Sequence, residues 1–331
     1  MNGRAANSNT QVRPPFDPEL AAALAAVKAG IPKMSPELLL ELRRMQGRGV
    51  LGAGAQDLTA GGSIRAEERS VPGPEGQPEV TVLILSPVGG GKGLPGIYYI
   101  HGGGMVLGDR RLGVEWLLPS VREGRAVVVS VEYRLAPEHP DPAPVQDSYA
   151  GLVWMAKNAG DLGLDPDRIM IAGGSAGGGL AAGTALLARD HGFPQLTHQM
   201  LICPMLDDRE QTYSSRMLVS EGVWTSEDNR FGWTSLLGRR RGGPDVSDYA
   251  SPARATDLSG LPRTYIDCGS AETFRDEILD YATRLSEAGV SVDLHMWGGG
   301  FHGFDLFVPY AAISRASIAT RDEFLRRALE A

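Results

Sequence analysis

A serine stands in a glycine-rich turn between an apolar segment and a run of small residues. The stretch IAGGSAGGGLAAG, residues 171–183, contains the pattern G-x-S-x-G with Ser175 at its centre. Between a strand and a helix, this pattern places the serine on a sharp turn at the carboxyl edge of a sheet, where its hydroxyl is exposed to a substrate. Glycines flank the serine because a side chain would clash within so tight a turn. Ser175 is therefore predicted to be a nucleophile.

The same glycines permit a second interpretation. Residues 177–182, GGGLAA, also fit G-x-G-x-x-A, a dinucleotide-binding fingerprint in which Ser175 would be only a turn residue. The glycines would then lie inside the helix, where they would instead allow close packing on the sheet. The strand also occurs in mid-chain, with no earlier part of a dinucleotide-binding unit before it. The nucleophile interpretation is therefore favoured.

A second glycine cluster follows an apolar, strand-like run. Residues 96–109, GIYYIHGGGMVLGD, lead from that run into His101 and three consecutive glycines. A serine nucleophile needs hydrogen-bond donors for the negatively charged oxygen of its tetrahedral intermediate. Consecutive glycines let the backbone turn so that adjacent N–H groups point into the site, and a side chain there would block the acyl group. An ordinary flexible turn is the alternative, but the position directly after a buried strand favours an oxyanion loop.

Three carboxylates lie near the end of the strand-like run at residues 263–269. Asp267 ends the run itself and suits a structural role as well as a catalytic one. Asp276 lies in the first turn of a predicted helix, where acidic residues suit the helix N-terminus. Glu272 lies in the loop between them, from which a carboxylate can reach the Nδ1–H of a histidine. Glu272 is the favoured acid, with Asp267 and Asp276 as alternatives.

His302 is the predicted general base. It lies in GGGFHGFDLF, after the last strand-like run at residues 291–297, and so at the carboxyl edge of the sheet. The chain order serine, acid, histidine is that of α/β-hydrolases. Each of the other histidines suits a structural role better, because it falls in a turn, at a helix end or in a strand: His101, His139, His191, His198 and His295.

The remaining pattern predicts the framework that positions these residues. Short apolar runs, several buried on both faces, alternate with helical segments, which indicates an α/β fold with a mostly parallel central sheet flanked by helices. The expected strands are residues 80–87, 96–102, 125–133, 167–174, 197–205, 263–269 and 291–297; the expected helices are residues 17–30, 35–47, 145–158, 176–189, 274–288 and 310–329. Residues 1–60 and 207–250 are predicted to form a helical cap over a catalytic domain made of residues 61–206 and 251–331.

Composition narrows the classes of partner. The chain has 331 residues, 42% hydrophobic, and a net charge of −8, without a long basic run. Nucleic acid and anionic membrane surfaces are therefore not expected partners. Cys203 and Cys268 are far apart in apolar contexts, which favours buried free thiols over a disulfide or a zinc site. There is no secretory signal and no membrane-spanning run, so a cytoplasmic location is expected.

Five motifs together resemble the hormone-sensitive-lipase-like family of bacterial α/β-hydrolase esterases. They are HGGG at residues 101–104, YRLAPEHP at 133–140, GGSAGG at 173–178, ETFRDE at 272–277 and HGF at 302–304. They occur in the family's order and at similar spacing, and the resemblance covers roughly residues 60–331. In one respect the chain departs from the pattern, because the family most often has aspartate where this chain has Glu272.

The resemblance implies a carboxylic-ester hydrolase that needs no metal or organic cofactor. It implies an α/β-hydrolase fold with a helical cap, Ser175 as nucleophile, His302 as base and Glu272 as acid. It also implies an oxyanion hole formed by the N–H groups of Gly103, Gly104 and Ala176. Residues 133–138, with Asp147 beyond them, would brace the structure. Short- to medium-chain acyl esters and a homodimer are expected from the family.

Two alternatives remain at this point. A lactone or an amide could replace the ester, because the same triad serves all three and only the shape of the pocket decides. From a different class, plant gibberellin receptors resemble the family and bind a hormone without hydrolysing it, but they lack the histidine that is present here as His302. Five residues are candidates for the substrate pocket: Phe16, Met105, Val106, Trp224 and Trp233.

Overall fold

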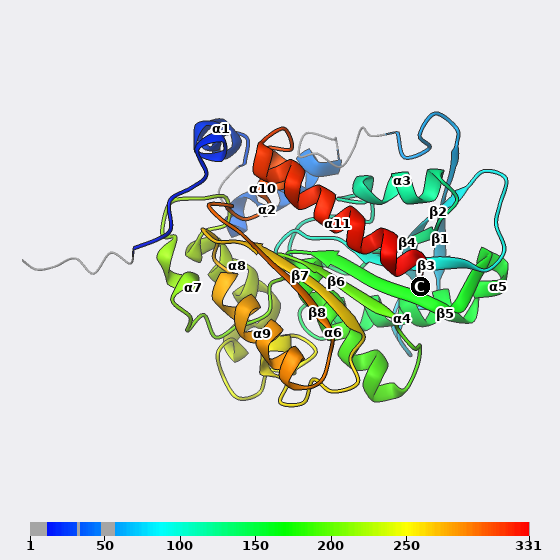
Figure 1. The fold of residues 1–331 in the computed structure, drawn as a ribbon. Helices are drawn as coiled ribbons and strands as arrows, with labels where there is room; N and C mark the ends of the chain where they lie inside the picture. Colours follow the sequence, from blue (N-terminus) through cyan, green and yellow to red (C-terminus); the bar gives the residue numbers. More distant parts are fainter. Residues whose placement is uncertain (1–11, 32–33, 48–56, 331) are drawn as a thin grey trace, which may run out of the picture.

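The central element is one eight-stranded sheet with strand order β1-β2-β4-β3-β5-β6-β7-β8 (Figure 1). It is seen in a computed structural model that describes residues 12–31, 34–47 and 57–330. The strands are β1 (Ile64–Val71), β2 (Val80–Pro87), β3 (Leu94–Ile100), β4 (Val127–Glu132), β5 (Leu164–Gly174), β6 (His198–Ile202), β7 (Arg263–Gly269) and β8 (Val292–Trp297). β2 pairs antiparallel with β1 and β4, and all other neighbours are parallel. The predicted α/β fold with a mostly parallel sheet is confirmed.

The seven apolar runs predicted as strands correspond to β2 through β8. β1 was not predicted, because its sequence, IRAEERSV, has little apolar character. Only its first and last residues are buried, and it pairs with β2 at the edge of the sheet. A strand in this position exposes most of its side chains to solvent, so hydrophobic patterning gives no signal for it.

Helices cover both faces of the sheet (Figure 1). α3 (Leu118–Arg122) and α11 (Ala312–Glu330) lie on one face, and α4 (Ala143–Lys157), α6 (Ala176–His191) and α9 (Arg275–Glu287) lie on the other. The predictions for α4, α6, α9 and α11 are confirmed, with ends shifted by up to two residues. Within the described part of the chain, no helix combines the length and the apolar character needed to cross a membrane.

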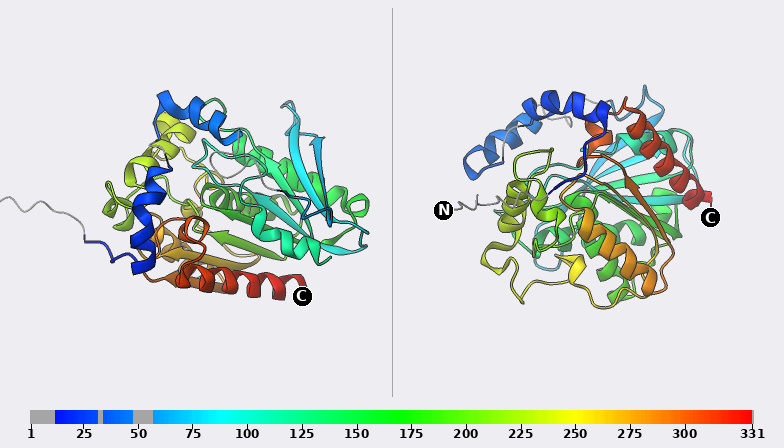
Figure 2. Two further views of the ribbon diagram at one scale, coloured as in Figure 1. Left: turned by 90° about the horizontal axis from the view of Figure 1, so that it is seen from above. Right: turned by 60° about the vertical axis from the view of Figure 1, so that its left-hand side comes forward.

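The N-terminal helices and the segment of residues 207–250 lie at the same end of the molecule (Figure 2). α1 (Pro18–Ala29) begins after Asp17, whose carboxylate accepts a hydrogen bond from the N–H of Glu19 at 2.9 Å, and α2 (Pro36–Gly47) follows. The later segment contains α7 (Ser214–Met217), α8 (Ser226–Leu237) and η2 (Gly238–Arg240), and no strand. Residues 1–11, 32–33 and 48–56 of the predicted cap lie outside the described residues. The remaining short helices are η1 (Glu115–Leu117), α5 (Ala159–Leu162), η3 (Pro252–Arg254) and α10 (Phe304–Phe307).

Candidate active site

Ser175 lies on the turn between β5 and α6, as the sequence predicts. Its φ of 56° and ψ of −121° are rare for a residue with a side chain, and such a conformation costs roughly 1–3 kcal/mol. The turn is held because the N–H of Ser175 donates to the carbonyl of Ile202 at 2.8 Å and its carbonyl accepts from Met205 at 3.0 Å. A Cβ on Gly177 would lie 2.1 Å from the carbonyl oxygen of Ile100. Glycine therefore allows α6 to begin this close to β3.

The glycines of α6 also speak against the dinucleotide-binding interpretation. A Cβ on Gly179 would lie 2.0 Å from the carbonyl oxygen of Met205, and one on Gly178 would lie 2.9 Å from Pro204. Both glycines are fully covered by the segment that follows β6. They serve close packing between α6 and that segment, and they present no open backbone surface to a pyrophosphate group.

The predicted oxyanion donors lie on two segments next to Ser175. Gly103 and Gly104 have φ values of 115° and 62°, in the left-handed region that favours glycine. A Cβ on Gly102 would lie 3.5 Å from the Cβ of Ser175, so this loop runs beside the serine. Ala176 is the first residue of α6, where N–H groups have no partner within the helix. Both segments therefore border the space that a substrate carbonyl on Ser175 would enter.

The residues that follow β4 contact the oxyanion loop, and hydrogen bonds hold them in place. The ring of His101 stacks on Tyr133 with centroids 4.2 Å apart, and the Tyr133 hydroxyl donates to the carbonyl of His101 at 3.0 Å. Burial lowers the pKa of His101, which favours the neutral ring. Next along the chain, the Arg134 guanidinium donates two hydrogen bonds of 2.8 Å to the buried carboxylate of Asp147. Tyr133, Arg134 and Asp147 thus make contacts of the kind that the resemblance implies for a brace.

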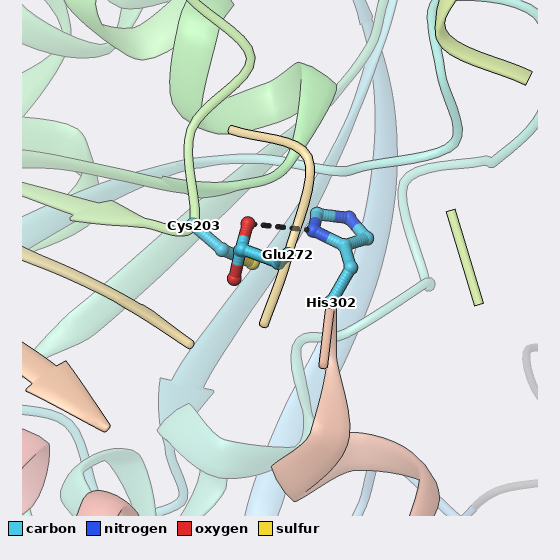
Figure 3. Close-up of side chains that lie close together, drawn as sticks. All are labelled: Cys203, Glu272 and His302. Carbon is cyan, nitrogen blue, oxygen red and sulfur yellow. Dashed lines mark hydrogen bonds and ion pairs between the residues drawn. The ribbon is translucent and has the colours of Figure 1, made fainter. Parts of the chain in front are cut away.

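His302 joins the serine to a buried carboxylate. It lies in the loop between β8 and α10, and its Nε2 is 2.9 Å from Ser175 Oγ. Its Nδ1 is 3.2 Å from Glu272 Oε1 (Figure 3). The other carboxylate oxygen of Glu272 accepts a 2.8 Å hydrogen bond from the N–H of Gly269, and the side chain is fully buried. The structure therefore brings together the three residues singled out in the sequence as one hydrogen-bonded chain.

Two influences act on the pKa of His302 in opposite directions. Burial lowers it, and the carboxylate of Glu272 raises it by stabilising the charged ring. A general base gains from this arrangement, because the imidazolium that forms when it takes a proton is stabilised. Burial raises the pKa of the Cys203 thiol, and contact with His302 only partly opposes that effect.

The two alternative acids are engaged elsewhere. Asp267 accepts a 2.8 Å hydrogen bond from Nε of the buried Arg321, which comes from α11. Asp276 accepts from the N–H of Ser214 at 2.8 Å and from the side chain of its neighbour in sequence. Within the described residues, neither carboxylate forms a hydrogen bond with His302. Glu272 is the carboxylate that contacts the histidine.

Two aromatic rings pack near the imidazole of His302. The ring of Phe274 meets the imidazole edge-on at 5.1 Å between centroids, and that of Trp224 lies 6.1 Å away. Trp224 also covers the oxyanion loop, because a Cβ on Gly104 would lie 2.3 Å from its ring. Of the other pocket candidates, Met105, Val106 and Trp233 are fully buried in the same core cluster as Trp224 and Phe274, and Phe16 packs on Phe301.

Cys203 also lies next to the site, although the sequence predicted only that its thiol is buried. It follows β6 directly, and β6 lies between β5 and β7 in the sheet. Since the carboxyl ends of parallel strands meet at one edge, a residue just after β6 must fall between Ser175 and Glu272. The strand order of the fold, combined with the predicted strand ends, was the signal that could have found it.

Comparisons with known proteins match this chain to α/β-hydrolases and esterases. A family model described as alpha/beta hydrolase fold matches residues 97–306. Carboxylesterase NlhH of Mycobacterium tuberculosis is 40% identical over 264 residues, covering 75% of this chain and 79% of the relative. Carboxylic ester hydrolase LipN of the same organism is 37% identical over 247 residues, covering 73% and 64%. The solved structure of a bacterial heroin esterase superposes with a TM-score of 0.87 at 40% identity, covering 95% of this chain and 98% of that one.

The fold and the matched region thus define an α/β-hydrolase. Within that class, the chain belongs to the hormone-sensitive-lipase-like family of esterases, and the protein is a carboxylesterase. The resemblance stated from the five motifs is confirmed. The fold class, with its helix-flanked and mostly parallel sheet, is confirmed with it.

Proposed function

We propose that the protein hydrolyses carboxylic esters through a Ser175–His302–Glu272 triad and a covalent acyl-enzyme. The observation that carries the proposal is the continuous hydrogen-bonded chain, with 2.9 Å between Ser175 Oγ and His302 Nε2 and 3.2 Å between Nδ1 and Glu272 Oε1. A nucleophile, a base and a group that orients the base are the three parts that such catalysis requires.

Each residue has one task in this mechanism. Ser175 Oγ attacks the ester carbonyl while His302 Nε2 takes its proton, and Glu272 holds Nδ1–H and stabilises the imidazolium. His302 then gives the proton to the leaving alcohol, which leaves the acyl group on Ser175. A water molecule repeats the cycle, with His302 again as base, and releases the carboxylic acid.

The N–H groups of Gly103, Gly104 and Ala176 are the proposed oxyanion hole. The left-handed conformation of the two glycines and the helix N-terminus at Ala176 support this assignment. The N-terminus of a helix also favours negative charge, which adds to the effect of the individual donors.

Residues 1–60 and 207–250 are proposed to form the cap that limits the acyl chain to short or medium length. Contacts between the two parts support a common unit, since Lys28 Nζ donates to the carbonyl of Ser220 at 2.6 Å and Tyr213 donates to the carbonyl of Val12 at 2.8 Å. Trp224, from the second part, covers Gly104 of the oxyanion loop. A homodimer and a cytoplasmic location stay predictions.

A labelling experiment tests the proposal directly. The protein is incubated with a fluorophosphonate, digested and analysed by mass spectrometry, while hydrolysis of p-nitrophenyl acetate and butyrate is followed in parallel. We expect one phosphonylated residue, Ser175, and loss of hydrolysis in proportion to labelling. Full hydrolytic activity in a completely labelled sample would contradict the proposal.

The same assay separates the remaining alternatives. Lactone and amide hydrolysis use the same triad, so matched lactone and anilide substrates are measured beside the aryl esters. The names of the matched relatives favour the ester. The hydrogen bond between His302 and Ser175 speaks against a hormone-receptor-like protein, because such a receptor has no use for a paired base and nucleophile.

A further inference from the structure

A thiol, a carboxylate and an imidazole converge at the buried end of the triad. The side chains of Cys203, Glu272 and His302 come from three separate loops and point toward one another (Figure 3). One ligand atom from each lies within 4.8 Å of the others, and all three residues are buried. Cys203 has a φ of 37°, and its N–H donates to the carbonyl of Asp267 at 2.9 Å. The backbone that carries the thiol is therefore held in place beside the acid and the base.

These three groups are the ligand types that zinc-like cations prefer. With Zn–S near 2.3 Å and Zn–N and Zn–O near 2.0–2.2 Å, tetrahedral ligands lie roughly 3.3–3.8 Å apart. The Nδ1–Oε1 distance of 3.2 Å already fits, and the thiol needs to approach by only about 1 Å. We propose that Cys203 Sγ, a Glu272 oxygen and His302 Nδ1 bind a thiophilic divalent cation, such as Zn²⁺ or Cd²⁺, and that this binding inhibits the esterase.

The inhibition follows from the chemistry of imidazole, and this part rests on the proposed triad. The metal takes the lone pair at Nδ1, so the single ring proton moves from Nδ1 to Nε2. Nε2–H can donate to Ser175 but can no longer accept its proton. The thiol proton leaves to solvent as the thiolate binds. The cation also occupies Glu272, so base and acid are both withdrawn from the reaction.

Metal titrations on a set of variants test the inference. Zinc chloride is titrated into the p-nitrophenyl acetate assay, with each variant compared with its own uninhibited rate. Cadmium chloride is titrated into the same proteins while the ultraviolet thiolate-to-cadmium absorption band is recorded. The variants are Cys203→Ala, Cys203→Ser, Cys268→Ala and Ser175→Ala. Cys268 is the matched control, because it is buried in β7 and lies outside the cluster.

We expect zinc to inhibit the wild type reversibly, with recovery on adding EDTA. Cys203→Ala should need at least about tenfold more zinc, because loss of even an outer-shell partner of a metal ligand typically costs 10–100-fold in affinity and here a ligand itself is lost. Cys268→Ala should match the wild type. The cadmium band should be present in the wild type, in Cys268→Ala and in Ser175→Ala, and absent from Cys203→Ala. Cys203→Ser gives the same comparison should the alanine variant fail to fold.

Two outcomes would overturn the site. One is equal zinc sensitivity in folded Cys203→Ala and wild type, which would mean that the metal binds His302 without the thiol. The other is a wild type with no cadmium band. Failure of the proposed function has a different signature: Ser175→Ala would keep its hydrolytic activity, while the cadmium band and its dependence on Cys203 would remain.

Discussion

Replacing Glu272 with glutamine tests the acid of the triad at one atom. In the wild type, Oε2 accepts a hydrogen bond from the N–H of Gly269, and Oε1 faces Nδ1 of His302. In Glu272→Gln, the amide carbonyl is the group that can still accept from Gly269, so the NH₂ group must face Nδ1. An NH₂ group can only donate, which makes Nδ1 an acceptor and places the ring proton on Nε2. Nε2 then cannot accept the proton of Ser175.

The size of the effect follows from this change of tautomer. The corresponding exchange of an acid for its amide in serine hydrolases lowers turnover about ten-thousand-fold while the geometry stays intact. That factor corresponds to ~5 kcal/mol of lost transition-state stabilisation. Glu272→Asp should also be impaired, because the aspartate side chain is shorter by one carbon–carbon bond, about 1.5 Å. The wild-type distance between Nδ1 and Oε1 is already 3.2 Å, at the upper end for a hydrogen bond.

The assay is kcat and kcat/KM with p-nitrophenyl acetate on folded protein. Folding is checked by circular dichroism and a thermal melt. Asp267→Asn and Asp276→Asn are the matched controls, since both are acid-to-amide changes on the two elements that flank the Glu272 loop, β7 and α9. Both should keep most of their turnover. Asp267→Asn should lower the free energy of unfolding by about 3–5 kcal/mol, because it removes a partner of the buried Arg321.

The opposite order of activities among these variants would contradict the role of Glu272. An inactive Asp276→Asn beside a nearly normal Glu272→Gln would show that Glu272 is not the acid. A Glu272→Gln enzyme with at least a tenth of wild-type turnover would show that the tautomer of His302 is not set by this contact.

Three further changes probe the nucleophile, the oxyanion loop and the pocket wall. Ser175→Ala should lose turnover on the order of a million-fold while its melting temperature stays close to that of the wild type, and a tenth of wild-type turnover would refute its role. Gly104→Val should be nearly inactive, because a φ of 62° and a ring 2.3 Å from the new Cβ displace the loop and a lost donor alone costs roughly 3 kcal/mol. An active Gly104→Val variant with unchanged acyl-chain preference would show that this loop is an ordinary turn and not an oxyanion loop. Trp224→Ala should raise the kcat/KM ratio of p-nitrophenyl octanoate to acetate by about tenfold or more, and an unchanged ratio would exclude Trp224 as a wall of the acyl site.

Much of the framework could be read from the sequence because buried strands carry a strong local signal. β3 and the second half of β5, from Ile169 on, are apolar and buried, and the turns after them carry glycines that only a close backbone approach explains. β1 gave no such signal, since its neighbours in space rather than its own residues decide that it forms a strand. Local pattern cannot report a strand whose stability comes from pairing with β2 and whose side chains face solvent.

Which carboxylate faces His302 depends on contacts between residues far apart in the chain, and a local sequence pattern does not reveal them. Asp267 and Glu272 are five positions apart, one near the carboxyl end of β7 and the other just beyond it. The difference comes from Arg321, more than fifty positions further along: its buried guanidinium pairs with Asp267 and also with Asp305, three residues after His302. Arg321 from α11 thus pairs with Asp267, and through Asp305 it also holds the segment that follows His302. Glu272 is left to face Nδ1, and Asp267 acts on the site only through the position of that loop.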